Sequence, residues 1–344
     1  MEEMLKYDKV AEPQKAEKAR IWKTAIGLQA VDGLQTSDYL LDVARQHIEG
    51  DITIDEAGQY LREYYKARDA RLEPDARQEE ADIVSQRITK VLSDGGFSFT
   101  PAFYCGIHRK LFEGIYKFAG QIRDYNITKK EWVLSGDTVI YGNAPDISTT
   151  MEYDFGVERA FKYKGLDKRG IIEHISHFVA YLWQIHPFGE GNTRTTAVFA
   201  ILYLRSLGFD VDNDLFENNS WYFRNALVRA NYNNLKKGIA ADPSFLEAFF
   251  DNLLYGGNNI LSNRSMHDRH PLEKKGSGSD RKRTILDFIE KNPGCSAVLI
   301  SKELEIPLRT IQRELASLSD TIEHRGSSKT GGYYLKLGIE KTAS

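Results

Sequence analysis

Cysteine is scarce in this sequence of 344 residues, which holds only Cys105 and Cys295. Two cysteines so far apart supply neither a disulfide framework nor the paired spacing of a zinc finger, and they fit a reducing compartment. No run approaches the roughly 18 consecutive apolar residues of a membrane-spanning helix. The N-terminal stretch MEEMLKYDKV is charged and carries no apolar signal segment. We therefore expect a cytoplasmic protein without membrane contacts.

A strong charge of either sign is also lacking, because the formal net charge is only −3. This balance argues against a protein that coats nucleic acid along its whole surface, although it permits a local basic patch. Hydrophobic residues make up 41% of the chain and aromatic residues 11%, which is enough for a substantial core. At this length we expect two or three domains.

The most informative stretch covers residues 186–194, His-Pro-Phe-Gly-Glu-Gly-Asn-Thr-Arg. Apolar helical patterns precede and follow it, so the run is a polar loop that enters a helix N-terminus. Free backbone N–H groups at such a terminus hold anions, and glycines let the backbone come close. His186 is suited to act as a general base, Glu190 as an oxygen ligand for Mg²⁺ and Arg194 as a fork for phosphate oxygens. The residues alone thus predict attack on a metal-bound polyphosphate.

The same run resembles the signature of the Fic family, His-Pro-Phe-x-Asp/Glu-Gly-Asn-Gly-Arg-x-x-Arg. It departs from that signature at Thr193, which stands in place of a glycine, and at Ala197, which stands in place of the second arginine. Two further stretches, residues 107–112 and 116–123, resemble other parts of the Fic core. The resemblance implies a mainly α fold whose Fic-type helical core spans residues 73–262.

A change of character at residues 132–141 predicts a hairpin. Two β-rich runs, Trp-Val-Leu and Thr-Val-Ile-Tyr, lie on either side of a Ser-Gly-Asp turn. Fic proteins carry a β-hairpin flap at this point of the chain. By resemblance, the flap at 127–141 would bind a protein target by adding a strand.

The resemblance implies a protein adenylyltransferase, which moves AMP from ATP to a Tyr, Ser or Thr hydroxyl with the help of Mg²⁺. His186 would accept the hydroxyl proton, and Glu190 would hold the metal. Arg194 and Asn192 would stabilise the phosphates. The expected nucleotide contacts are Phe188, Gly189, Glu190, Gly191, Asn192, Thr193, Arg194, Tyr222 and Asn225.

Two other functions stay open at this stage. Thr193 adds a Cβ where the signature has glycine, so the transferred group could be a phosphoryl group or come from another nucleotide donor. Alternatively, the Fic-like core only senses nucleotide and the chain is a DNA-binding regulator. A pure sensor would not need the base His186 beside the metal ligand Glu190, which favours an enzyme.

The front region, residues 1–72, resembles the inhibitory segments or antitoxins of the family. By this resemblance its inhibitory carboxylate would be Asp32 or, as a rival, Glu49. The family pairs that carboxylate with the second signature arginine, which Ala197 replaces here. We therefore expect the front helices to pack on the core without the usual salt bridge, and to inhibit weakly or sterically.

The C-terminal part begins with a polar linker at 263–282. Residues 283–338 contain three helical patterns and a glycine-tipped hairpin, which resemble a winged helix-turn-helix. Over residues 281–337, ten Lys and Arg stand against seven Asp and Glu, an excess of +3. DNA is therefore a candidate partner, with contacts expected from Arg309, Thr310, Gln312, Arg313, Arg325 and Lys329. The alternative is a module for protein contact or dimerisation, so a homodimer is also open.

Overall fold

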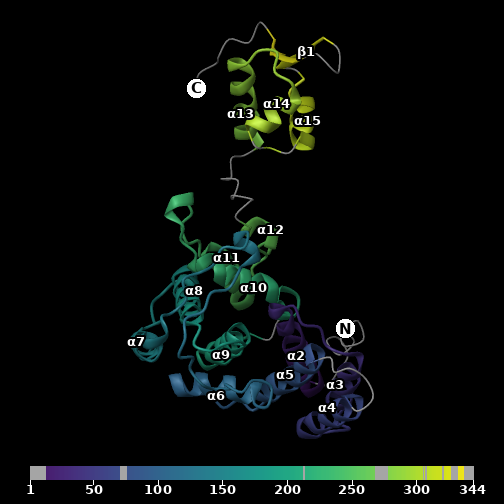
Figure 1. The fold of residues 1–344 in the computed structure, drawn as a ribbon, viewed down its shortest axis with the longest axis vertical. Helices are drawn as coiled ribbons and strands as arrows, with labels where there is room; N and C mark the ends of the chain where they lie inside the picture. The colour runs from purple at the N-terminus through teal and green to yellow at the C-terminus, as the bar shows by residue number, and fades with distance from the viewer. Residues whose placement is uncertain are drawn as a thin grey trace. The chain divides into compact units, whose positions relative to one another are not determined.

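The computed structural model describes residues 13–69, 76–211, 214–267, 278–304, 306, 308–319, 321–326 and 332–336. These residues are mainly helical, as expected (Figure 1). None of the helices described there combines the length and the apolar character needed to cross a bilayer. The described residues group into two compact units, one ending at His267 and one beginning at Gly278.

Four helices form the described part of the front region in the first unit. They are α2 (Pro13–Gly27), the 3-10 helix η2 (Leu28–Asp32), α3 (Asp38–Glu49) and α4 (Ile54–Asp69). The Ser37 hydroxyl caps α3 by accepting from the Leu40 N–H, and Thr53 forms a capping box with Glu56 before α4. Trp22 on α2 belongs to a small core shared with α3 and α4, whereas Ile21 belongs to the main core. The two faces of α2 thus join the front helices to the rest of the unit.

The main core is built around α9, which is buried throughout its first thirteen residues, 192–204. Helix α9 packs against α5, α6, α8 and η2. A helix buried on all sides places its N-terminus inside the protein, where its free N–H groups need partners or a ligand. The helices that form this core are α5 (Ala76–Ser93), α6 (Pro101–Phe112), α7 (Ile147–Ala160), α8 (Lys168–Ile185), α9 (Asn192–Ser206), α10 (Leu215–Asn231), α11 (Ser244–Tyr255) and α12 (Asn263–Met266).

A close backbone approach fixes η2 beside α10. A Cβ built on Gly27 would lie 2.4 Å from the Glu217 Cα, so only glycine fits there. The Ser220 hydroxyl donates to the Gly27 carbonyl at 2.5 Å. Since η2 follows Gly27 directly and also packs against α9, this approach holds Asp32 near the N-terminus of α9.

The flap segment, residues 127–141, contains no strand, so the expected hairpin of paired strands is wrong. The chain reverses through the 3-10 helix η3 (Trp132–Leu134), and the Glu131 N–H donates to the Asp137 carbonyl at 2.9 Å. Val133 and Leu134 are buried by this turn, and Ser135 then adopts a positive φ of 55°. Burial of the first apolar run in a tight turn prevents it from extending as a strand.

The second unit follows the expected order of elements. It contains α13 (Gly278–Lys291), α14 (Ala297–Glu303), α15 (Leu308–Ser317) and the antiparallel strands β1 (Ile322–Arg325) and β2 (Gly332–Leu335). Ile322 pairs with Leu335, and Arg325 pairs with Gly332. The core of this unit includes Ile289, Ile300, Ile311, Leu315 and Ile322. Its assignment as a winged helix stays a prediction.

Two histidines of the first unit are neutral because they are buried and accept hydrogen bonds. His47 on α3 accepts from Trp22 Nε1 at 3.0 Å through its Nδ1. His108 on α6 accepts from the Gly120 N–H at 2.8 Å through Nδ1, so its Nε2 carries the hydrogen and donates to the Glu190 carbonyl at 2.9 Å. Burial is the main reason that the pKa of His47 and that of His108 fall to about 4.

We predict that the free energy of unfolding decreases as the pH falls from 6.5 toward about 4. In that window the unfolded chain binds protons that the folded chain does not, so stability is highest above the upper limit and is lost on acidification. Each histidine contributes at most about 3 kcal/mol to this decrease in the free energy of unfolding. Urea denaturation at about pH 7 and about pH 4.5 measures the loss.

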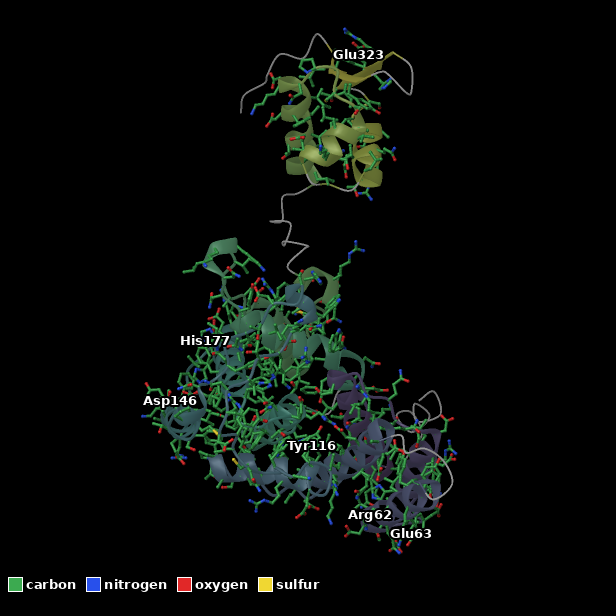
Figure 2. The ribbon with its side chains drawn as sticks, viewed as in Figure 1. Arg62, Glu63, Tyr116, Asp146, His177 and Glu323 are labelled. Carbon is green, nitrogen blue, oxygen red and sulfur yellow. The ribbon has the colours of Figure 1, made fainter. Side chains whose placement is uncertain are left out.

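The control for this prediction is a histidine on the surface. His108→Gln should reduce the pH dependence, whereas His177→Gln, at an exposed position of α8, should leave it unchanged (Figure 2). An equal pH dependence in the wild type and in His108→Gln would contradict the assignment.

Candidate active site

The loop between α8 and α9 is shaped by two residues with positive φ. His186 ends α8 with a φ of 49°, and Gly191 precedes α9 with a φ of 77°. A Cβ on Gly191 would lie 2.5 Å from the Phe112 ring, so both the dihedral and the space require glycine. The loop thereby delivers His186 to one side of the α9 N-terminus, where free N–H groups favour an anion.

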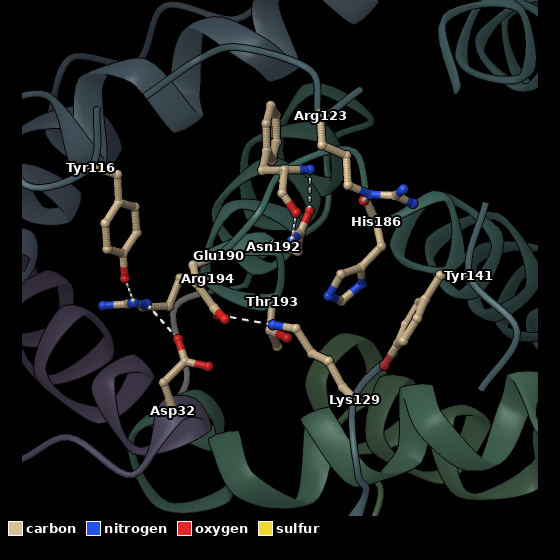
Figure 3. A network of polar contacts seen from close by, with 12 residues as sticks. Asp32, Tyr116, Arg123, Lys129, Tyr141, His186, Glu190, Asn192, Thr193 and Arg194 are labelled. Atoms are coloured by element: carbon tan, nitrogen blue, oxygen red, sulfur yellow. Dashed lines mark hydrogen bonds and ion pairs between the residues drawn. The ribbon is translucent and has the colours of Figure 1, made fainter. Parts of the chain in front are cut away.

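The His186 ring is buried and oriented by a single hydrogen bond. Its Nδ1 lies 3.1 Å from the Trp183 carbonyl, an acceptor, so Nδ1 carries the hydrogen and Nε2 keeps its lone pair. The Tyr141 ring packs on the imidazole with 4.3 Å between the centroids (Figure 3). Burial and, after it, the charge of Lys129 hold the pKa of His186 well below its usual range. The imidazole is therefore neutral at physiological pH and is able to accept a proton.

The Asn192 side chain has a different role from the expected one. Its Oδ1 accepts from the Phe188 N–H at 3.0 Å, and its Nδ2 donates to the Phe188 carbonyl at 2.7 Å. The Phe188 ring is buried and stacks on His108, with 3.8 Å between the centroids. As corrections, the Asn192 amide is committed to the loop rather than to a phosphate, and Phe188 anchors the loop rather than touching a nucleotide.

Thr193 replaces the signature glycine without distorting the turn. It lies in the first turn of α9, and its hydroxyl accepts from Trp183 Nε1 at 3.0 Å. The extra side chain is therefore packed against α8, and the backbone stays helical. Gly189 lies beside Tyr125, whose hydroxyl would be 2.7 Å from a Cβ at that position.

Arg194 is the most heavily engaged cation of the site. Its side chain is only 1% exposed, and its Nε lies 2.8 Å from Asp32 Oδ2 (Figure 3). Its Nη2 lies 2.6 Å from Glu80 Oε1. It also donates to Gln29 Oε1 at 3.0 Å and to the Tyr116 hydroxyl at 3.3 Å. Burial alone would lower the pKa of Arg194, but the neighbouring Asp32 and Glu80 charges raise it above its ordinary value.

The front helices pack on the core without the usual salt bridge to a second signature arginine, which Ala197 replaces, but a different salt bridge is present. Asp32 forms its ion pair with Arg194, the first signature arginine, instead of with the residue at 197. Ala197 is buried one turn further along α9. The structure does not bring the rival candidate Glu49 to the site, since Glu49 ends α3 and pairs with Lys15 at 2.8 Å on the surface.

Glu190 is the exposed carboxylate of the loop. Its side chain is 54% exposed, and its Oε2 lies 2.9 Å from Lys129 Nζ of the flap. No group of three or more His, Cys, Asp or Glu side chains suited to a metal occurs in the described part of the chain. A single carboxylate nevertheless suits Mg²⁺, which keeps several waters and is held largely by substrate phosphates. The donor chemistry of Glu190 fits the expected metal.

A cavity of about 450 Å³ opens beside Arg194 and Glu190, within the size range of small-molecule sites. The front helices, the loop, the flap and α10 all contribute to its wall. Its lining includes Asp32, Arg77, Glu80, Tyr116, Lys129, Glu190, Arg194, Trp221 and Arg224. An aromatic ring together with several cations is a suitable surface for a nucleotide.

Tyr222 and Asn225, expected to contact the nucleotide, lie away from this cavity. The buried Tyr222 hydroxyl donates to the Phe245 carbonyl at 3.0 Å, and Asn225 Nδ2 donates to Asn263 Oδ1 at 2.8 Å. Sequence reasoning missed Trp221 and Arg224, which line the cavity instead. Their spacing of three residues was the available signal, because residues three apart share a helix face.

A buried carboxylate of the flap connects this cavity to the ring that packs on His186. Glu131 accepts from Arg224 at 2.6 and 3.2 Å and from the Tyr141 hydroxyl at 2.9 Å. Tyr141 is the residue whose ring packs on His186. A buried carboxylate with a bidentate arginine and a phenol is well compensated, so this group holds Tyr141 firmly.

The DNA-binding candidates lie in the second unit. Gln312 and Arg313 are exposed on α15, and Thr310 is half-buried there. Arg325 on β1 pairs with Glu323 and stacks on the Tyr334 ring at 4.9 Å. Lys329 and the Arg309 side chain lie outside the described part of the structure.

Two curated proteins resemble part of the chain. A stretch of 148 residues is 29% identical to the probable protein adenylyltransferase y4lH of Sinorhizobium fredii, covering 43% of this chain and 72% of that protein. A stretch of 128 residues is 30% identical to the protein adenylyltransferase VbhT of Bartonella schoenbuchensis, covering 37% of this chain and only 25% of that protein.

A solved structure and a family profile complete the comparison. A Fic family protein from Desulfovibrio desulfuricans G20 aligns over 99% of this chain and 94% of its own, with 14% identity and a TM-score of 0.47. Residues 98–204, which contain the His186–Arg194 loop, match the profile of the Fic/DOC family. This chain thus carries a Fic/DOC family domain over residues 98–204.

Proposed function

We propose that this protein is an adenylyltransferase that moves AMP from ATP to a hydroxyl side chain of a target protein or of itself. The observation that carries the proposal is the neutral, buried His186 with a free Nε2 lone pair at the N-terminus of α9. A base of this kind, beside an anion-binding helix end, suits attack of a hydroxyl on a phosphate. The relatives named as adenylyltransferases support AMP as the transferred group.

In the proposed reaction, the hydroxyl oxygen of the target forms a bond to the α-phosphorus while the bond to the bridging oxygen breaks. His186 Nε2 takes the hydroxyl proton, and pyrophosphate leaves with the electron pair. The backbone N–H groups of Gly191, Asn192 and Thr193 bind the phosphate oxygens. Arg194 holds the phosphates that depart.

Glu190 would hold Mg²⁺ at the phosphates. When bound, the metal neutralises phosphate charge and supports departure of pyrophosphate. The exposed carboxylate of Glu190 and the adjoining cavity support this role. The other residues of the loop bind and orient the phosphates and take up the hydroxyl proton without help from the metal.

The flap at 127–141 is proposed to receive the target and the second unit to bind DNA. Ile140 on the flap is 81% exposed, which leaves an apolar side chain available to a target. Gln312 and Arg313 leave a polar helix face available to nucleic acid. We also propose that the protein forms a homodimer and is located in the cytoplasm.

Radiolabelled ATP tests the reaction. We predict that label at the α-phosphate is transferred to protein and that label at the γ-phosphate is not. His186→Ala should reduce transfer by a factor of about 10²–10⁴, since the general base is lost. His177→Ala, at the exposed position on α8, is the matched control and should keep full activity.

Each alternative gives its own result in this experiment. Transfer of the γ-label would favour a phosphotransferase. Absence of transfer from either position would favour a DNA-binding regulator with a nucleotide-sensing core.

We further propose that the front helices restrain the enzyme through Asp32. The Asp32 carboxylate competes with phosphates for the buried Arg194 guanidinium, because both are anions that seek the same donors. Glu80 shares the restraint through its contact of 2.6 Å with Nη2. Inhibition would therefore be electrostatic rather than merely steric.

We predict that Asp32→Ala raises the rate of α-label transfer about tenfold, which corresponds to removal of about 1.4 kcal/mol of competition. The rest of the restraint should persist through Glu80. Asp42→Ala is the control, because it removes the same charge from an exposed position on α3 that pairs with Arg45. A rate unchanged by Asp32→Ala, or raised equally by Asp42→Ala, would refute control through Arg194.

A further inference from the structure

Several cationic side chains line the cavity, and they differ in how firmly their carboxylate partners hold them. Its charged lining consists of Arg77, Lys129, Arg194 and Arg224 against Asp32, Glu80 and Glu190, so the sum is 4 − 3 = +1. Helix α9 contributes only Arg194, since its next turn presents the buried Ala197. Other elements must therefore supply any further positive charge that a polyphosphate requires.

Two of these cations are fixed in place. Arg194 is buried between two carboxylates. Arg224 is held in bidentate fashion by the buried Glu131, and its guanidinium lies 5.2 Å from the centre of the Trp221 ring. Both guanidinium groups therefore stay where they are: Arg194 is itself buried, and moving Arg224 would leave the buried Glu131 without its partner.

Lys129 differs because its partner is exposed. Its ammonium pairs with Glu190, the carboxylate proposed to hold the metal. The Lys129 side chain is 25% exposed, and a lysine is a point charge on a flexible four-carbon stem. A divalent cation on Glu190 would repel the ammonium from the position that it now occupies.

We propose that Lys129 changes partners when a metal–nucleotide complex binds, leaving the Glu190 carboxylate for the phosphate oxygens. It neutralises Glu190 while no metal is present, and it moves to the phosphate oxygens once Mg²⁺ enters with a nucleoside triphosphate. The free ammonium then supplies three donors to the phosphates from the flap side of the cavity. This inference rests on the proposed function and assigns the flap a part in nucleotide binding.

The exchange makes Lys129 selective for nucleotides that bring a metal. A triphosphate chelates Mg²⁺ and thus releases Lys129, whereas a monophosphate brings no tightly chelated metal and leaves Lys129 on Glu190. Removing Lys129 should therefore weaken the triphosphate and spare the monophosphate. Metal alone should bind Glu190 more readily without the competing ammonium.

Isothermal titration calorimetry on full-length protein tests the proposal. The ligands are α,β-methylene-ATP with Mg²⁺, which cannot release pyrophosphate, and AMP. We expect Lys129→Ala to weaken binding of the triphosphate analogue about tenfold and to leave AMP within about twofold. Lys130→Ala removes the same charge from the adjacent exposed residue and should change neither affinity.

A second readout follows the metal. Electron paramagnetic resonance of Mn²⁺ without nucleotide should show tighter binding to Lys129→Ala than to the wild type. An unchanged affinity for the triphosphate analogue, an equal loss for both nucleotides, or unchanged Mn²⁺ binding would each overturn the proposal.

The proposed function fails separately. If neither the wild type nor Asp32→Ala binds the triphosphate analogue, adenylyl transfer from ATP is excluded together with this inference. If the analogue binds but Lys129→Ala behaves as the wild type, only the role of Lys129 is lost.

Discussion

The buried guanidinium of Arg194 is the constraint around which the site is arranged. A charge taken out of water is stable only when it finds partners; here Glu80 and Gln29 accept hydrogen bonds, and Asp32 supplies an opposite charge. Gln29 and Asp32 both lie on η2, and Glu80 lies on α5. The same donors are those that phosphates would require. The packing of η2 on α9 and the proposed binding of a nucleotide therefore involve the same side chain.

The loop between α8 and α9 is held in place by hydrogen bonds among its own polar groups and from α6. Asn192 closes the loop on the Phe188 backbone, and His108 donates to the Glu190 carbonyl from beneath. The stacked rings of His108 and Phe188 fill the space below it. These contacts leave His186 on one side of the loop and Arg194 on the other. The loop thus separates the proposed proton acceptor from the charge proposed to bind phosphate, an arrangement that suits an in-line transfer.

Much of this site could be predicted from the sequence, because the chemistry is local. Nine consecutive residues contain the proposed base, the proposed metal ligand and the arginine, and helical periodicity placed them between two helices, as α8 and α9 bear out. The mainly α fold and the order of the C-terminal elements followed from the same patterns. Asp32 was also identified as a candidate, although its partner was not.

The remainder depended on tertiary contacts that no local pattern reveals. The position of Asp32 beside Arg194 depends on the approach of Gly27 to α10. Which face of α10 lines the cavity is decided by the packing of Tyr222 against α11. The flap sequence has β propensity, yet burial of Val133 and Leu134 favours a turn. In each instance packing overrode the local preference.

The most direct test of this account is amide hydrogen exchange of the full-length protein with and without ATP and Mg²⁺. If phosphates displace Asp32 from Arg194, saturating ATP should speed exchange in residues 28–34 and slow it in residues 186–194. Unchanged or slower exchange in residues 28–34 at saturation would contradict the claim that nucleotide and front helices compete for one guanidinium.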